Sequence, residues 1–442
     1  MMALLIYFFG PQNLEPRLCA AIISWVAFWW LTPLIPLSVT GLLGICLAQL
    51  AGLSSWKALL APFADPIIFL FMGGFMLARA VEVRGLDRWW VNRAQSIIGN
   101  RPRRMYLTLV VLAAGLSAFL SNTATTALLL PVGIELLRRS KLELKTHAPL
   151  LLMLAGASSI GGSMTPVGSP PNMVALGLME KMLGTRPDFL TWMLHMVPLS
   201  LSILAALLLL YRPLWRAIPE SGDLGLTQEG ALSLQQKTLM LLIGLTFCGW
   251  LFPGLLKAFH LELPVLAWAQ ESSVAFIAMV LLFLIPTPLA PLLRWEEAKD
   301  IDWGTLLLFG AGLSLGQLAF ETGLAQILAQ RLQQISHFPP RVLFAVAILG
   351  TLFLTEIASN TATANLVTPI LLAGALGDVS PALIIFAIVA ASNFAFMLPV
   401  GTPPNAIVYS TGLIPITRMI GLGLRMNLMA FILILGFVLF IF

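Results

Sequence analysis

The hydrophobic and polar positions of this 442-residue chain form long apolar runs separated by short polar segments. A membrane-spanning helix needs about 20 mainly apolar residues. Runs close to that length predict spans near 17–32, 37–53, 65–83, 193–211, 236–256, 272–293, 303–324 and 426–442. Residues 1–9 are apolar but too few for a full span. The pattern predicts an all-α polytopic membrane protein.

Four further apolar regions, 104–139, 147–180, 341–376 and 382–412, are interrupted by polar residues, glycine and proline. Irregular backbone at membrane depth is tolerated only where it is buried in protein or lines a watery cavity. Such breaks at matching points of two repeats indicate the binding site of a transporter.

The breaks are duplicated within the chain. Adding 238 to each residue number carries Ser121-Asn122-Thr123 onto Ser359-Asn360-Thr361. Adding 233 carries segment 166–172, Pro-Val-Gly-Ser-Pro-Pro-Asn, onto segment 399–405, Pro-Val-Gly-Thr-Pro-Pro-Asn. Two matching motifs in the same order predict two structural repeats, residues 1–214 and 237–442, joined by a cytoplasmic linker at 215–236.

Composition supports a bilayer location, since 59% of the residues are hydrophobic and 10% are charged. Soluble domains carry about a quarter charged residues. The net charge of +5 indicates membrane topology and no nucleic-acid partner, because no basic run alternates with stacking aromatic residues. The three cysteines lie at unrelated spacings in apolar stretches and predict neither disulfides nor a metal site.

Basic residues orient the spans, because cytoplasmic loops are enriched in Lys and Arg. They flank both ends of segment 104–139, whereas the far end of segment 341–376 has Asp378 and no basic residue. We expect two re-entrant hairpins, 104–139 entering from the cytoplasm and 341–376 from outside. Each precedes a broken helix, at 147–180 and 382–412. These inverted-topology repeats place the N-terminus in the cytoplasm and the C-terminus outside the cell's inner (plasma) membrane.

The motifs contain serine, threonine and asparagine but no acid, base or thiol. Helix N-termini at the breaks suit carboxylates or other oxyanions, and carbonyl, hydroxyl and amide oxygens suit an alkali cation. An enzyme would need a nucleophile with a base, or a metal cluster. A channel would show polar residues continuing across the membrane. The pattern therefore favours a transporter, although one isolated motif could also serve only to pack helices together.

The paired Ser-Asn-Thr motifs, each followed by Pro-Val-Gly-Ser/Thr-Pro-Pro-Asn, resemble those of the divalent anion/sodium symporter family of dicarboxylate transporters. The resemblance extends over nearly the whole chain. It implies about eleven transmembrane helices plus two hairpins. It also implies a homodimer and elevator-type movement of a transport domain against a scaffold domain.

The resemblance further implies which residues bind the ligands. One sodium ion would be bound by Ser117, Ser121, Asn122 and Gly168, and a second by Thr355, Ala358, Asn360 and Gly401. The substrate would contact Ser121, Asn122, Thr123, Ser169, Ser359, Asn360, Thr361, Thr402 and Pro403.

We therefore expect sodium-coupled symport of C4-type dicarboxylates such as succinate, malate and fumarate, with Na⁺ as the coupling ion. No Lys or Arg lies in the motifs, so sodium ions would have to compensate the charge of the dianion. The alternatives are a sodium-independent exchanger of di- or tricarboxylates with the same fold, and a transporter of sulfate or another divalent oxyanion.

Three charged residues in apolar surroundings need an account. Glu356 lies three residues before Ser359, and it either orients the hairpin or faces a watery surface. Arg79 and Glu82 lie near the end of a predicted span, which indicates that their side chains snorkel to the membrane interface.

Overall fold

The computed structural model describes residues 13–32, 34–98, 101–140, 149–220, 231–261, 270–287, 291–335, 339–373 and 379–441, and every regular element in these ranges is a helix. In chain order these are α2 (Leu14–Leu31), α3 (Leu37–Leu50), α4 (Trp56–Leu60), the 3₁₀ helix η1 (Ala61–Ala64), α5 (Pro66–Val83), α6 (Leu86–Ile98), α7 (Pro102–Ser117), α8 (Asn122–Arg139), α10 (Pro149–Gly162), the 3₁₀ helix η2 (Pro166–Gly168), α11 (Pro170–Leu183), α12 (Phe189–Leu210), α13 (Arg212–Arg216), α14 (Leu234–Ala258), α15 (Glu271–Leu284), α16 (Trp295–Ala298), α17 (Trp303–Glu321), α18 (Leu324–Ile335), α19 (Pro340–Ile357), α20 (Asn360–Ala373), α21 (Pro381–Asn393), α22 (Pro403–Tyr409) and α23 (Ile416–Ile441).

Seven helices within the described residues are long and apolar enough to cross a membrane. They are α2, α5, α12, α14, α17, α19 and α23. The predicted spans 37–53 and 272–293 are shorter in the structure, where α3 and α15 have 14 residues each. The predicted short apolar segment 1–9 and residues 221–230 of the predicted linker lie outside the described residues. The prediction of an all-helical membrane protein is confirmed.

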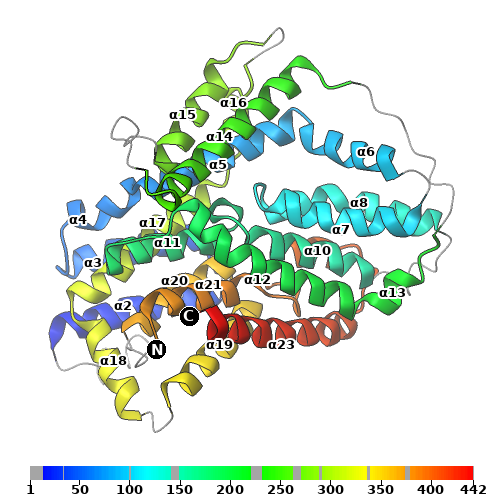
Figure 1. Cartoon of the computed structure of the whole chain (residues 1–442). Coiled ribbons are helices and arrows are strands. Elements are labelled where there is room, and N and C mark those ends of the chain that lie inside the picture. The colour runs from blue at the N-terminus through cyan, green and yellow to red at the C-terminus, as the bar shows by residue number, and fades with distance from the viewer. Residues whose placement is uncertain are drawn as a thin grey trace.

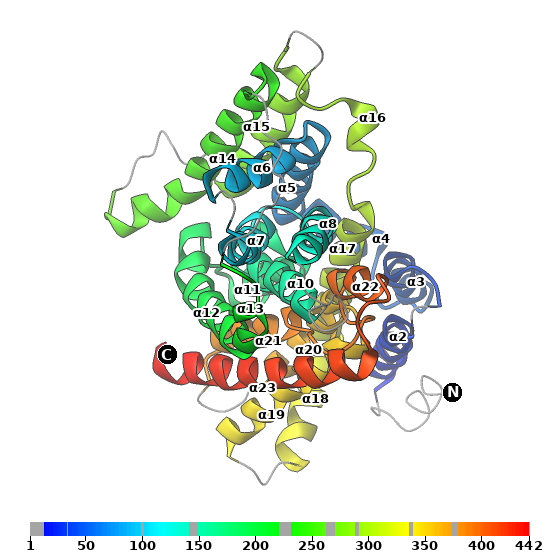
Figure 2. The same ribbon diagram turned by 90° about the vertical axis from the view of Figure 1, so that its right-hand side faces the viewer.

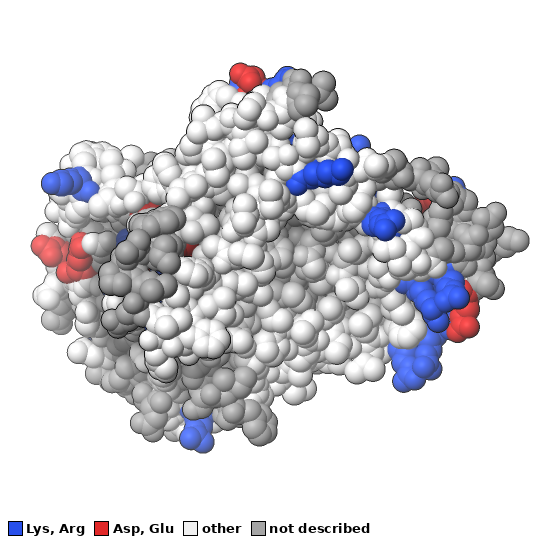
Figure 3. All heavy atoms as spheres, turned by 45° about the horizontal axis from the view of Figure 1, so that its top comes forward, with Lys and Arg blue, Asp and Glu red and all other residues white. Residues whose placement is uncertain are grey.

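The surface supports the same conclusion. Large apolar side chains are exposed along several of the long helices, among them Leu194, Leu209, Leu241, Leu245 and Ile432. Figure 3 shows a broad face on which charged side chains are sparse and gather toward the edges. An exposed apolar surface of this extent is typical of contact with lipid.

Both predicted hairpin segments consist of two helices separated by a short break. Helices α7 and α8 lie side by side in Figure 1 and are separated by residues 118–121, and α19 and α20 are separated by 358–359. Ser121 ends the first break as the N-cap of α8, because its Oγ accepts a hydrogen bond from the Ala124 amide at 3.2 Å. The breaks therefore place the Ser-Asn-Thr motifs at helix N-termini.

The two predicted broken helices lie at the centre of the molecule. Every residue of α10 is buried, and in α21 every residue from Leu383 to Asn393 is buried. Helix α10 packs against α7, α8, α12 and α22. Two prolines begin α11 after the first break and α22 after the second, at positions where a missing N–H costs no helical hydrogen bond. The breaks are thus enclosed by protein.

Two connecting helices, α6 and α18, were not predicted. They link α5 to the first hairpin and α17 to the second, and their first residues, Leu86 and Leu324, are related by the same offset as the Ser-Asn-Thr motifs. Gly85 and Gly323 precede them with φ angles of 64° and 77°, a left-handed conformation that glycine adopts without strain. The duplication thus extends beyond the motifs to the bends between helices.

The helices are arranged around these central elements in two groups. Helices α5, α14 and α15 pack together at the top of Figure 1, whereas α2, α3 and α17 share a separate apolar core. Figure 2 shows α23 crossing the opposite side of the molecule, where it packs against α12, α19 and α21. The hairpin α7–α8 packs on α10, and the hairpin α19–α20 packs on α21.

Candidate functional site

A cavity of about 790 Å³ lies where the two hairpin tips and the two helix breaks meet. All nine residues that the sequence predicts for the substrate line it: Ser121, Asn122, Thr123, Ser169, Ser359, Asn360, Thr361, Thr402 and Pro403. The structure therefore brings together residues from both halves of the chain in one place. Their role in binding the substrate stays a prediction.

The first residues of four helices face the cavity. They belong to α8 and α20 at the hairpin tips and to α11 and α22 after the breaks. Helix N-termini carry partial positive charge and unpaired amide groups, so they favour a bound anion. Among the described lining residues there is no histidine, cysteine or lysine. The described residues also hold no group of three or more His, Cys, Asp or Glu side chains that could bind a metal ion. Its chemistry is that of reversible binding.

Each hairpin tip is held by the same hydrogen bond. Ser117 Oγ donates to Asn122 Oδ1 at 2.5 Å, and Thr355 Oγ1 donates to Asn360 Oδ1 at 2.7 Å. The two pairs occupy equivalent positions of the two repeats. Ser117 and Thr355 are fully buried behind the cavity wall. Each pair therefore sets two oxygen atoms side by side, an arrangement suited to an alkali cation.

The remaining predicted sodium residues lie beside these pairs. Gly168 and Gly401 line the cavity, as do Ser121 and Ala358. A Cβ atom added at Gly168 would lie 2.5 Å from the Gly162 carbonyl oxygen, so a side chain does not fit there. At Gly401 the nearest atom would be 3.0 Å away. The same Cβ would lie 2.9 Å from the Ala118 carbonyl oxygen at Gly168 and 3.3 Å from that of Glu356 at Gly401, so glycine brings the backbone of each break close to its hairpin.

The two breaks are closed by equivalent asparagines. Asn172 Nδ2 donates to the carbonyl oxygens of Gly162 and Thr165 at 3.0 and 2.8 Å. Asn405 Nδ2 donates to those of Ala395 and Leu398 at 3.0 and 3.1 Å. Adding 233 to the first set of residue numbers gives the second. The last residue of each Pro-Pro-Asn motif is therefore a structural clamp across its break.

Asn393, which sequence reasoning missed, joins the two halves at the centre. Its Oδ1 accepts from Ser169 Oγ at 2.6 Å, and its Nδ2 donates to Asn172 Oδ1 at 2.8 Å. Its carbonyl oxygen lies 3.4 Å from Asn360 Nδ2. The equivalent position in the first repeat is Ile160, so comparison of the repeats gave no signal for it. A polar residue within the apolar run 383–393 was the signal available.

Glu356 orients the second break and does not face water. Its carboxylate is buried and accepts hydrogen bonds from four donors at 2.7–3.0 Å. These are the backbone amides of Phe396, Met397 and Leu398 and the side-chain amide of Asn427. Of the two sequence interpretations, the orienting one is supported.

In the first repeat a different contact connects the hairpin helix to its break. Ala118, the equivalent of Glu356, has no carboxylate, and its carbonyl oxygen accepts a hydrogen bond from the Thr165 hydroxyl. In both halves the end of the hairpin helix is thus tied to the neighbouring break.

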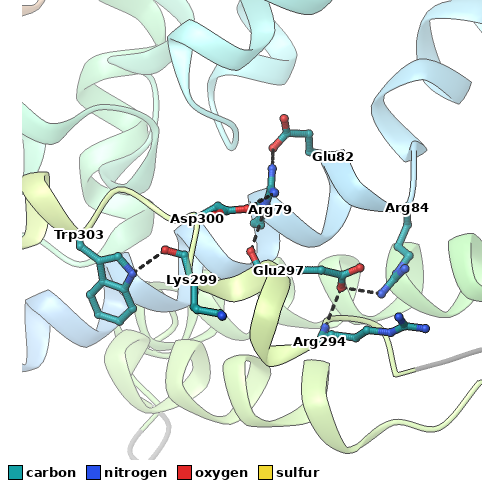
Figure 4. Close-up of polar contacts among 8 residues, drawn as sticks. All are labelled: Arg79, Glu82, Arg84, Arg294, Glu297, Lys299, Asp300 and Trp303. Carbon is teal, nitrogen blue, oxygen red and sulfur yellow. Dashed lines mark hydrogen bonds and ion pairs between the residues drawn. The ribbon is translucent and has the colours of Figure 1, made fainter.

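Arg79 and Glu82 also make contacts that the sequence did not predict. Both line the cavity, and Arg79 Nη1 donates to Glu82 Oε2 at 2.8 Å. Arg79 Nη2 donates to Asp300 Oδ2 at 2.7 Å, across to the segment before α17 (Figure 4). Sequence reasoning missed this contact because its partners are 221 residues apart.

Comparison with known proteins gives consistent results. The protein family described as citrate transporter matches residues 23–390 and 265–442 in two overlapping alignments. The sodium-dependent dicarboxylate transporter SdcS of Staphylococcus saprophyticus is 33% identical over 100% of this chain and 89% of the relative. The protein of the same name from Staphylococcus aureus is 32% identical, over 98% and 87%. In structure, the Alcanivorax borkumensis YdaH transporter is similar with a TM-score of 0.55 and 14% identity, over 87% of this chain and 88% of that one.

Proposed function

Because the chain belongs to the citrate transporter family and to the divalent anion/sodium symporters that its motifs resemble, we propose that it is a sodium-coupled symporter of C4-type dicarboxylates. Succinate, malate and fumarate are the substrates proposed. The observation that carries the proposal is the single cavity at which both Ser-Asn-Thr tips and both breaks meet. The relatives named above are sodium-dependent dicarboxylate transporters, so the chemistry of the cavity and the family agree.

Charge compensation is the physical reason for sodium coupling. A dicarboxylate brings about two negative charges to the cavity. Each helix N-terminus offers only about half a positive charge, and the unpaired carbonyl groups of the helix C-termini beside it partly offset that charge. The hairpin tips and breaks supply neutral donors and no Lys or Arg. In this proposal two Na⁺ ions compensate the rest, one at Ser117, Ser121, Asn122 and Gly168 and the other at Thr355, Ala358, Asn360 and Gly401.

The proposal includes the arrangement in the membrane. The two repeats have inverted topology, with about eleven spans and two re-entrant hairpins. The N-terminus is cytoplasmic and the C-terminus external. The protein works as a homodimer in the inner (plasma) membrane, and its transport domain moves as an elevator against a scaffold domain. The matched hydrogen bonds of the two hairpins support a common function for both halves.

The test is uptake of radiolabelled succinate, malate, fumarate, citrate and sulfate by purified protein in liposomes. We expect a sodium gradient to drive uptake of at least one C4 dicarboxylate, and replacement of sodium by choline to abolish it. An uptake rate that does not depend on sodium but rises when the liposomes are preloaded with dicarboxylate would contradict symport and indicate an exchanger. Preference for sulfate would contradict the substrate class.

A further inference from the structure

Arg79 stands out among the residues that line the cavity. In the part of the chain that the structure describes, it is the one Lys or Arg on the lining, against four acidic residues: Glu82, Asp87, Asp300 and Asp302. These charges lie on elements other than the hairpins, namely α5, α6 and the segment that leads into α17. The part of the cavity that they form is called the vestibule below.

The position of Arg79 on its helix explains why it reaches the vestibule. Phe75, Ala78, Arg79 and Glu82 are three or four residues apart, so they share the face of α5 that lines the cavity. Opposite this face is the segment from Asp300 to Thr305. Figure 4 shows the Arg79 side chain extending between these two walls.

The contacts of Arg79 use only part of its hydrogen-bonding capacity. Nε donates to the Glu297 carbonyl oxygen at 3.2 Å, Nη1 to Glu82 at 2.8 Å and Nη2 to Asp300 at 2.7 Å. A guanidinium group carries more N–H groups than these three contacts use. The side chain is 24% exposed, so it is accessible from the cavity.

We propose that Arg79 is the residue on which the dianion docks in the vestibule, before it reaches or after it leaves the neutral donors of the hairpin tips. This inference rests on the proposed transport of dicarboxylates. The N–H groups that Glu82 and Asp300 leave unused donate to one substrate carboxylate. The guanidinium is the one cationic group on a described lining that is otherwise acidic, and an arginine fork suits a carboxylate in geometry.

The two acidic partners weaken the contact between Arg79 and the dianion. Glu82 and Asp300 already share the positive charge of Arg79, so the dianion is held weakly there. A transport pathway needs sites that bind enough to admit a ligand and weakly enough to release it. The partners are 53% and 64% exposed, so solvent screens their influence and the expected effects are moderate.

A purely structural role for Arg79 makes a different prediction. If the arginine served only to join α5 to the segment before α17, loss of either partner would break the same link. Arg79→Gln and Asp300→Asn would then impair uptake in the same way. In the docking proposal the two variants shift KM in opposite directions. Arg79→Gln removes the cationic group, whereas Asp300→Asn removes a carboxylate that competes with the dianion for it.

The experiment measures KM and Vmax of sodium-driven [¹⁴C]succinate uptake in proteoliposomes. We expect Arg79→Gln to raise KM by roughly two- to fivefold with little change in Vmax, which matches an exposed charge contact. Asp300→Asn and Glu82→Gln should lower KM by a similar factor and also lower Vmax, since release is slower. Arg79→Lys, which keeps the charge but not the fork, should fall between wild type and Arg79→Gln. Choline chloride at high concentration should shrink every shift.

The matched control is Glu220→Gln. Glu220 pairs with Arg103 at 2.5 Å, is 79% exposed and does not line the cavity, so KM should not change. Shifts of KM in the same direction in Arg79→Gln and Asp300→Asn, or no shift in either, would overturn the docking role. Sodium-driven dicarboxylate uptake by the wild type would still support the proposed function. Absence of dicarboxylate uptake by the wild type would reject the proposed function itself. If Arg79→Gln is not monodisperse, the two acidic variants decide, because docking requires both to lower KM.

Discussion

At the scale of single residues, the site is built from polar groups that hold one another in place. The hydroxyls of Ser117 and Thr355 do not reach the cavity, yet each fixes the amide of an asparagine that does. A cation that binds to the amide oxygen would also meet the hydroxyl oxygen beside it. The two buried hydroxyls are therefore best placed to affect sodium without touching the substrate.

We predict that Ser117→Ala and Thr355→Ala each raise the sodium concentration needed for half-maximal uptake. Removal of one neutral oxygen ligand should cost about 1 kcal/mol, a shift of roughly fivefold. Succinate uptake is measured against sodium concentration at saturating substrate. Thr246→Ala is the control, since that buried hydroxyl only donates to Leu242 of its own helix. An unchanged sodium dependence in both test variants would remove these residues from the sodium sites.

Glu356 is a stability residue in this structure, because four N–H donors converge on its buried carboxylate. Glu356→Ala leaves these donors without their acceptor, at about 1–3 kcal/mol for each group that water does not reach. We expect a fall in Tm of roughly 5 °C or more in detergent. Glu135→Ala should leave Tm nearly unchanged, since that carboxylate is 52% exposed and pairs within α8. Equal Tm values for the two variants would contradict the orienting role.

How far the site could be predicted depended on the duplication. The duplication singled out Asn122 and Asn360, because the same residues occur at the same place in both halves, and the family resemblance implied their binding role. Asn393 forms hydrogen bonds with both Ser169 and Asn172. Its counterpart in the first half is Ile160, so comparison of the two halves could not predict its role. The Arg79–Asp300 contact depends on how distant segments pack. Sequence periodicity carries no information about such a contact.

At the scale of helices, the apolar runs predicted the long elements and the polar breaks predicted the interruptions. Helices α6 and α18 were missed because a search for long apolar runs passes over short amphipathic segments. Their bends depend on Gly85 and Gly323, at which an added Cβ would meet no atom within 4 Å. Any cost of a side chain there comes from the backbone conformation alone.

We therefore predict that Gly85→Ala and Gly323→Ala each destabilise the protein by about 1–2 kcal/mol, the cost of a left-handed conformation for an L-residue. The Tm should fall by roughly 1–4 °C. Gly115→Ala is the matched control, because Gly115 also has open space around it but lies within helix α7. Alanine should stabilise that position by up to about 1 kcal/mol. A Tm for Gly85→Ala at or above that of Gly115→Ala would contradict this account.

At the scale of the whole molecule, two repeats converge on one cavity. The hairpins, the breaks and the connecting helices all recur in the same order in each half. The inversion of the repeats in the membrane remains a prediction that rests on the loop charges. It requires that equivalent ends of the two hairpins lie on opposite sides of the bilayer.

Cysteine labelling distinguishes inverted from parallel repeats. Arg104 and Arg341 are exposed near the starts of α7 and α19, so Arg104→Cys and Arg341→Cys place thiols at equivalent ends. The background carries Cys46→Ser and Cys248→Ser, because Cys46 is half-buried and Cys248 is exposed, and it retains buried Cys19. In intact cells a membrane-impermeant maleimide should label Arg341→Cys and not Arg104→Cys, since basic residues flank both ends of the first hairpin and favour the cytoplasm. In permeabilised cells the maleimide should label both variants, which shows that both thiols are reactive. If both thiols react from the same side, the inverted arrangement is wrong, and with it the assignment of the second hairpin to the outside.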